Sequence, residues 1–163
     1  IRKVIGHRTI FNLLGPLSNP ARVKRQLIGV FAPELCNLMA ETCQILGHDQ
    51  AMIVHGEDGT DELSVTGSTH VAHLREGRIR YSMIRPQDEG LTLHPGRALI
   101  GGDAMQNARA LEDVLKGDES AYADAVLLNT AAMLQMDDKA RSLSDGIALA
   151  RSAIARGEAI SRL

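Results

Sequence analysis

Aromatic residues are scarce in this sequence of 163 residues: tryptophan is absent, and tyrosine and phenylalanine occur twice each. This scarcity disfavours an aromatic-centred β-sandwich and predicts an aliphatic, alanine-rich core of closely packed helices. No apolar run approaches the ~18 residues that a membrane span requires. The longest candidate is interrupted by polar side chains at Asp124, Asn129, Thr130 and Gln135. We therefore expect a globular protein with no membrane partner.

Cysteine and excess basic charge are also lacking. The two cysteines, Cys36 and Cys43, lie in a segment predicted to be helical. Seven helical residues rise ~10.5 Å, which is farther than the ~7 Å that a disulfide tolerates. We therefore expect buried thiols and a reducing, cytoplasmic location. Eighteen basic and 20 acidic residues give a net charge of −2, whereas nucleic-acid binders are usually basic, so no nucleic-acid partner is expected.

No secretory leader is expected, because Arg2 and Lys3 lead directly into patterned sequence with no apolar segment of the signal-peptide kind. The chain begins with Ile1 instead of Met, and we expect it to be part of a longer protein. Its length corresponds to one domain of the usual ~100–150 residues or slightly more.

The first half of the chain has the pattern of a strand, a helix and a strand. Apolar runs of strand length occupy residues 26–31 and 51–55. Between them, Pro33 suits a first helical turn and Gly47 suits a helix end. The stripe expected to face the core consists of Leu35, Leu38, Met39, Thr42 and Leu46. This order predicts parallel strands joined by a right-handed crossover.

The remaining segments complete an α/β pattern. Residues 70–74 and 78–84 alternate around Glu76-Gly77, which predicts a β-hairpin. Residues 1–25 are expected to be irregular. Helices are expected over residues 103–116, 120–136 and 142–156. The predicted fold class is therefore α/β, with a mainly parallel sheet, flanking helices and a hairpin.

A loop rich in glycine and acidic residues follows the second predicted strand. It contains four carboxylates, at Glu57, Asp58, Asp61 and Glu62. Ligands of open α/β sheets bind at the carboxyl ends of strands. Carboxylate oxygens suit Mg²⁺, which keeps several waters and adds substrate phosphates as ligands. Spacing alone leaves two interpretations open, a magnesium site and a solvated acidic turn.

Two further loops contain glycine. Gly15 allows close approach of a ligand to the backbone, and Arg2 and Arg8 could grip a carboxylate or phosphate. A connecting loop with solvated arginines explains the same residues. The second loop precedes a helix at Asp103, whose carboxylate would occupy the amides that a phosphate needs, so it predicts a helix cap.

Six stretches together carry a family resemblance: R-K-x-x-G at 2–6, RTIFNLLGPLSNPA at 8–21, QLIGVF at 26–31, VHGEDGTDELS at 54–64, GGD with NA at 101–108, and VLLNTAA at 126–132. Their order resembles the carboxyl-terminal half of the anthranilate phosphoribosyltransferases. The resemblance covers nearly the whole chain and implies a nucleoside phosphorylase/phosphoribosyltransferase-like fold.

The resemblance implies that the whole protein transfers the phosphoribosyl group of phosphoribosyl pyrophosphate to the amine of anthranilate, in tryptophan synthesis. It also implies Mg²⁺ dependence and a homodimer. Arg2 is implied to hold the anthranilate carboxylate, Gly15 to line the acceptor site, and Asp61 and Glu62 to bind Mg²⁺. No catalytic acid or base is assigned.

The resemblance also divides the chain into an acceptor-site loop region (1–25), strands with the acidic metal loop (26–100) and a helical portion (101–163). The family's amino-terminal helical domain and its G-T-G-G-D phosphate loop match nothing in 1–163, so this chain alone is expected to be inactive. Two alternatives stay open. One is a pyrimidine nucleoside phosphorylase-like enzyme, and the other is a non-enzymatic, nucleic-acid-binding paralogue that the pI of 6.3 disfavours.

Overall fold

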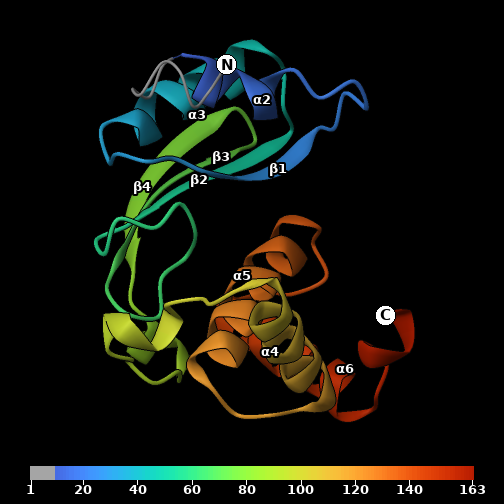
Figure 1. The fold of residues 1–163 in the computed structure, drawn as a ribbon. Helices are drawn as coiled ribbons and strands as arrows, with labels where there is room; N and C mark the ends of the chain where they lie inside the picture. The colour runs from blue at the N-terminus through green and yellow to red at the C-terminus, as the bar shows by residue number, and fades with distance from the viewer. Residues whose placement is uncertain (1–9) are drawn as a thin grey trace.

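The computed structural model describes residues 10–163, in which helices pack on both faces of one sheet (Figure 1). The strands are β1 (Arg25–Gly29), β2 (Gln50–Gly56), β3 (Thr69–Arg75) and β4 (Arg78–Ile84). The helices are α2 (Phe11–Leu17), α3 (Leu35–Ile45), α4 (Ala104–Lys116), α5 (Ala121–Met136) and α6 (Leu143–Ala155). Short 3₁₀ turns occupy Pro86–Glu89, Gly96–Leu99 and Ile160–Arg162. No helix within 10–163 is both long and apolar enough to cross a membrane.

The α/β class, the flanking helices and the hairpin are confirmed, but the expectation of a mainly parallel sheet is wrong for the described residues. The strand order is β1-β2-β3-β4. Only β1 and β2 pair in parallel, while β2–β3 and β3–β4 are antiparallel. The physical reason is connection length: α3 provides the crossover that a parallel pair needs, whereas two residues between β3 and β4 permit only a hairpin. Glu76 and Gly77 both have positive φ, as a tight hairpin turn requires.

The helical stripe predicted for α3 is rotated relative to the observed one. The residues that face the sheet are Cys36, Met39, Ala40 and Cys43, and both cysteines are free and buried. Leu38, by contrast, is 53% exposed. These four residues also follow i, i+3, i+4, i+7 spacing, and the small side chains of Cys36, Ala40 and Cys43 let the helix approach the sheet around the larger Met39.

The expectation that residues 1–25 are irregular is wrong for α2, which contains both Gly15 and Pro16. Leu13 and Leu17 of this helix pack against the core cluster that includes Ile28, Met39 and Ile53. Burial of these leucines stabilises a helix whose local sequence opposes it. The other predicted helices are confirmed as α4, α5 and α6, and Asp103, Ser120 and Ser142 cap them.

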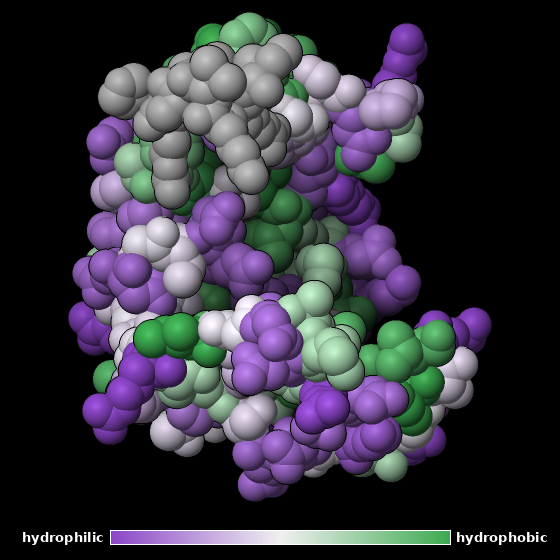
Figure 2. All heavy atoms as spheres, viewed as in Figure 1, coloured by the Kyte–Doolittle hydropathy of each residue, from purple (hydrophilic) through white to green (hydrophobic). Residues whose placement is uncertain are grey.

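The opposite face of the sheet is covered by α5 and α6. Their core cluster joins Met52 and Val54 of β2 to Leu127 and Leu128 of α5 and Ile147 of α6. Between β1 and α5 the surface is hollowed, and apolar atoms gather in the hollow between the sheet layer and the helices (Figure 2). The fold thus leaves an open, partly apolar recess beside β1, one of the two edge strands of the described sheet.

Candidate functional site

The hollow between β1 and α5 has a volume of about 720 Å³. Leu27 and Gly29 of β1 line one side, and the acidic loop contributes Thr60, Asp61 and Glu62. The α5 side is lined by Tyr122, Ala125, Val126, Asn129, Thr130 and Met133. Since Gly29 ends β1 and the acidic loop follows β2, the hollow opens at the carboxyl ends of the two parallel strands, where α/β sheets bind ligands.

Two of the four loop carboxylates have structural roles. Asp58 accepts hydrogen bonds from the hydroxyls of Ser64 (2.6 Å), Thr66 and Thr60 (2.8 Å) and from the backbone N–H of Thr60 (3.0 Å). Partial burial by itself would raise the pKa of Asp58, but these hydrogen bonds outweigh it and lower the pKa to about 2. Glu57 accepts a longer bond from the Ser68 N–H (3.3 Å). Asp58 therefore holds the loop together as a fixed anion.

The other two carboxylates, those of Asp61 and Glu62, are free of partners within the described part of the chain. Both are exposed, and neither forms a hydrogen bond or ion pair with any residue of 10–163. Unlike Asp58, they retain their lone pairs for a ligand. The structure thus separates the acidic loop into an internally bonded pair and a pair that faces the hollow.

The backbone that carries Asp61 and Glu62 is fixed on both sides. Before the pair, the Thr60 carbonyl accepts a hydrogen bond from the Gly56 N–H (2.9 Å). After it, the Leu63 N–H donates to Asn129 Oδ1 (3.0 Å), and Asn129 Nδ2 donates to the Leu63 carbonyl (2.9 Å). The two exposed side chains therefore project from a rigid support.

Gly29 is a site residue that the sequence analysis missed. A Cβ placed there would lie 1.6 Å from the carbonyl oxygen of Asp61, so only glycine lets the loop lie against the end of β1. The signal was present in the sequence, because a glycine inside an apolar strand run indicates close approach of another backbone.

The donor set fits Mg²⁺ of the kind that keeps several waters. No group of three or more His, Cys, Asp or Glu residues among those described could enclose a metal, which argues against a closed all-protein site. Two free carboxylates beside an open hollow match a cation that draws its remaining ligands from water and phosphate. Asp61 and Glu62 are the residues that would hold it.

The other predicted site residues lie apart from this pair or outside the described region. Arg2 and Arg8 fall outside residues 10–163, so their positions are not described. Gly15 is exposed on α2, and apart from its own helix no atom of residues 10–163 lies within 4 Å of its Cβ position, so the space beside it is open within the described region. Asp103 caps α4 by accepting from the Gln106 N–H (2.8 Å), as predicted.

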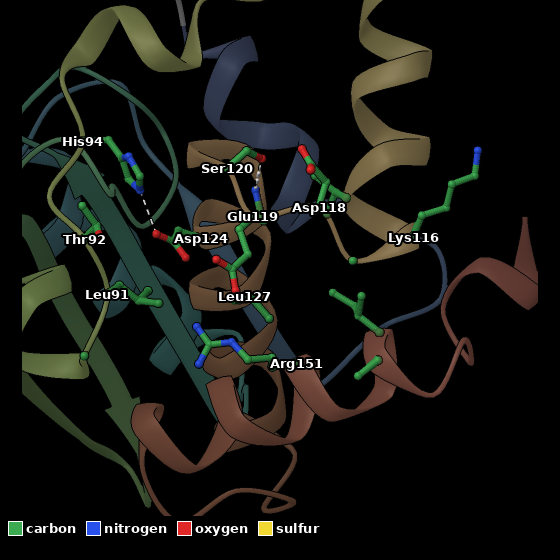
Figure 3. Close-up of a pocket in the computed structure, with 16 residues that line it drawn as sticks. Leu91, Thr92, His94, Lys116, Asp118, Glu119, Ser120, Asp124, Leu127 and Arg151 are labelled. Carbon is green, nitrogen blue, oxygen red and sulfur yellow. Dashed lines mark hydrogen bonds and ion pairs between the residues drawn. The ribbon is translucent and has the colours of Figure 1, made fainter.

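A second hollow, of about 570 Å³, lies at the first turns of α5 and against α6 (Figure 3). His94 and Asp124 pair across it at 2.7 Å between Nε2 and Oδ2, and Arg151 extends toward it (Figure 3). Its charged lining mixes Lys116 and Arg151 with acidic residues at 118, 119 and 124. Because these charges offset one another, the hollow favours no sign of ligand charge, and the β1–α5 hollow is the better candidate.

Comparison with known families gives a match over almost the whole chain. Residues 1–160 match the family described as "Glycosyl transferase family, a/b domain". Among similar proteins, the anthranilate phosphoribosyltransferase of Mesorhizobium japonicum is 52% identical over 99% of this chain, and that of Xanthobacter autotrophicus is 49% identical over 99%. The chain spans 48% and 47% of these relatives, about half of their length.

Solved structures of similar fold agree. An anthranilate phosphoribosyltransferase from Thermus thermophilus superposes with a TM-score of 0.86 at 42% identity, over 98% of this chain and 47% of the other. One from Saccharomyces cerevisiae, in complex with PRPP and Mg, has a TM-score of 0.87 at 31% identity, over 98% and 46%.

Proposed function

The chain belongs to the glycosyl transferase family through its a/b domain, and from this membership we propose that the whole protein is an anthranilate phosphoribosyltransferase. The observation that carries the proposal is the Asp61–Glu62 pair, whose free carboxylates face a hollow at the carboxyl ends of β1 and β2. Relatives that are 49–52% identical over this chain bear that name. We assign residues 1–163 to most of the α/β domain, with its acceptor-site region at 1–25, metal loop within 26–100 and helical portion at 101–163.

In this reaction the amine nitrogen of anthranilate forms a bond to C1 of the ribose. The bond from C1 to the pyrophosphate oxygen breaks, its electron pair leaves with pyrophosphate, and the amine gives up one proton. Asp61 and Glu62 would hold Mg²⁺, which supplies positive charge for the leaving pyrophosphate when bound. The fixed loop backbone keeps the two carboxylates in place and so avoids reorganisation during the reaction.

The acceptor is assigned to the amino-terminal region. The Arg2 guanidinium would grip the anthranilate carboxylate through two parallel hydrogen bonds. The open space at the Cβ position of Gly15 would let the acceptor ring approach closely. From the family resemblance we also propose that the whole protein is a cytoplasmic homodimer.

The test is an assay of the full-length protein with anthranilate, phosphoribosyl pyrophosphate and Mg²⁺, following the loss of anthranilate fluorescence. We expect turnover that stops when a chelator removes Mg²⁺ and resumes when Mg²⁺ is added back. A parallel assay supplies a pyrimidine nucleoside and phosphate. Phosphorolysis there, without turnover of anthranilate, would overturn the proposal in favour of a nucleoside phosphorylase.

A further inference from the structure

Asn129 lies near the middle of α5, and its side chain is used almost fully in hydrogen bonding. Its Oδ1 accepts from the Leu63 N–H (3.0 Å). Its Nδ2 donates one hydrogen to the Leu63 carbonyl (2.9 Å) and the other to the Ala125 carbonyl one helical turn earlier (3.0 Å). Three of the four hydrogen bonds available to an amide side chain are therefore formed, and two of them hold a residue 66 positions away.

Leu63 is the residue that follows the free carboxylate pair. Its side chain is buried in the core cluster with Val54 and Leu128. Its backbone N–H and carbonyl are both taken by Asn129. The position of Glu62, and through it of Asp61, is therefore set from the carboxyl side by a single amide side chain.

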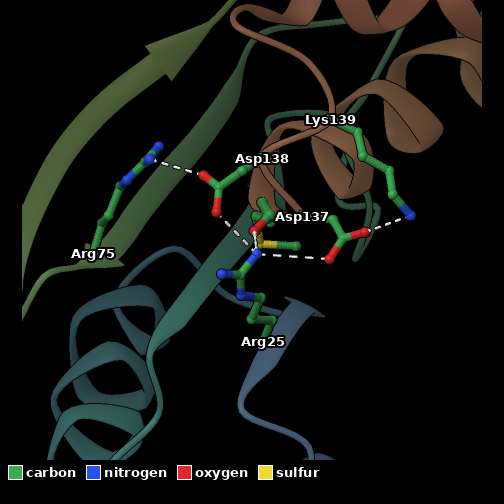
Figure 4. Close-up of polar contacts among 6 residues, drawn as sticks. Arg25, Arg75, Asp137, Asp138 and Lys139 are labelled. Atoms are coloured by element: carbon green, nitrogen blue, oxygen red, sulfur yellow. Dashed lines mark hydrogen bonds and ion pairs between the residues drawn. The ribbon is translucent and has the colours of Figure 1, made fainter.

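The helix that supplies this side chain is itself fastened to the sheet (Figure 4). Arg25 at the start of β1 donates to the carbonyl of Met136 (3.0 Å), which ends α5. The same guanidinium pairs with Asp138 at 3.0 Å, and Arg75 of β3 pairs with Asp138 at 2.9 Å. These contacts hold the far end of α5 against the sheet, so Asn129 connects the loop to a helix that has a fixed position.

We propose that Asn129 is a positioning residue that holds the backbone of the Asp61–Glu62 pair in the geometry that binds the divalent cation. This inference rests on the proposed function. An amide is required because one end must accept a hydrogen bond while the other donates. Aspartate retains the acceptor but loses both donors, and it places a negative charge against two carbonyl oxygens. Alanine removes all three bonds and leaves the Leu63 backbone groups without their side-chain partner.

The experiment compares full-length wild type with Asn129→Ala and Asn129→Asp. Ile147→Val on α6 is the matched control, because it loosens the same core without touching the loop. The first readout needs no turnover: Mn²⁺ is titrated in the presence of pyrophosphate, and free Mn²⁺ is followed by electron paramagnetic resonance. The second is the Mg²⁺ concentration that gives half-maximal rate, together with the KM for anthranilate. The thermal midpoint of each metal-free variant is measured alongside.

We expect both Asn129 variants to bind Mn²⁺ about tenfold or more weakly and to need correspondingly more Mg²⁺, with the KM for anthranilate nearly unchanged. Ile147→Val should lower the thermal midpoint and leave Mn²⁺ binding unchanged. Unaltered Mn²⁺ binding in both folded Asn129 variants overturns the proposal, and so does equal weakening by Ile147→Val, which would indicate a general loss of stability. If wild type binds Mn²⁺ with pyrophosphate but does not turn over anthranilate, the proposed function fails, and the binding comparison still decides the role of Asn129.

Discussion

Gly29 and Asp61 pack so closely that a methyl group on Gly29 would lie 1.6 Å from the carbonyl oxygen of Asp61 and 2.8 Å from its Cβ. The end of β1 and the loop after β2 thus share a contact that no larger residue permits. Through this contact the parallel strand pair positions the free carboxylates beside the hollow.

Substitution Gly29→Ala should displace the acidic loop, because the clash is with backbone and cannot be relieved by rotating a side chain. We expect a loss of about 1–3 kcal/mol in the free energy of unfolding and weaker Mn²⁺ binding in the presence of pyrophosphate. Urea denaturation and Mn²⁺ titration measure the two effects. Gly96→Ala is the control, since among residues 10–163 no atom beyond its chain neighbours lies within 4 Å of its Cβ position. If Gly29→Ala and Gly96→Ala had the same free energy of unfolding and the same Mn²⁺ affinity, the acidic loop would accommodate the added methyl group without loss of stability or binding.

Removing the negative charges of the proposed metal pair should raise the metal requirement. In the full-length protein, Asp61→Asn with Glu62→Gln should increase the Mg²⁺ needed for half-maximal rate by about tenfold or more, because neutral amides bind hard cations more weakly than carboxylates do. Glu57→Gln serves as a control from the same loop. A Mg²⁺ titration unchanged from wild type would contradict the assignment of the pair.

Substitution of Arg2 should change the KM for one substrate and not the KM for the other. An Arg–carboxylate contact contributes about 1.5–3 kcal/mol, which corresponds to tenfold or more in affinity. In the full-length protein, Arg2→Ala should raise the KM for anthranilate and leave the KM for phosphoribosyl pyrophosphate nearly unchanged. Equal changes in both constants would indicate a structural role for Arg2.

Asp58 should make stability depend on acid pH. Its hydrogen bonds lower the pKa from 3.8 to about 2, so its contribution is complete above pH ~4 and is lost as the pH falls toward 2. After allowance for solvent screening, the contribution is about 1 kcal/mol. Urea midpoints between pH 5 and 2.5 should fall more steeply in wild type than in Asp58→Asn. Parallel curves for the two proteins would show that Asp58 is not the titrating group.

The chain of 163 residues should show no transferase activity by itself. The free carboxylate pair is present, but the family's glycine-rich phosphate loop matches nothing in the sequence. Holding two substrates in register can contribute ~7–11 kcal/mol of barrier lowering, and half of a site does not supply it. The assay follows anthranilate fluorescence with the purified chain and the full-length protein side by side. Turnover within a hundredfold of full length would mean that the phosphate site is built from residues 1–163.

Local patterns determined most of the secondary structure. Glu76-Gly77 fixes the hairpin because both positions must adopt positive φ. Asp103, Ser120 and Ser142 begin helices because each accepts a hydrogen bond from a backbone N–H three residues later. The turn and the helix caps join residues that are close in sequence, so local sequence patterns are enough to predict them.

Longer-range packing decided where local patterns were ambiguous or opposed the outcome. Gly15 and Pro16 disfavour a helix, yet α2 forms because Leu13 and Leu17 are packed against the core. The α3 segment offers two overlapping apolar stripes that share Met39, and contact with the sheet selects the one that adds the small residues Cys36, Ala40 and Cys43. The antiparallel direction of β3 against β2 likewise depends on which strands become neighbours in the sheet.

In the candidate site, too, local sequence determined some features and long-range packing determined others. The sequence by itself determined that four carboxylates lie in one loop after a strand, and family resemblance singled out Asp61 and Glu62. Only the tertiary structure decided which carboxylates are free, because Ser64 and Thr66 turn back to bond Asp58 while Asn129 reaches Leu63 from 66 residues away. Hydrogen bonds between residues distant in sequence depend on the packing of α5 against the sheet, and no local pattern encodes that packing.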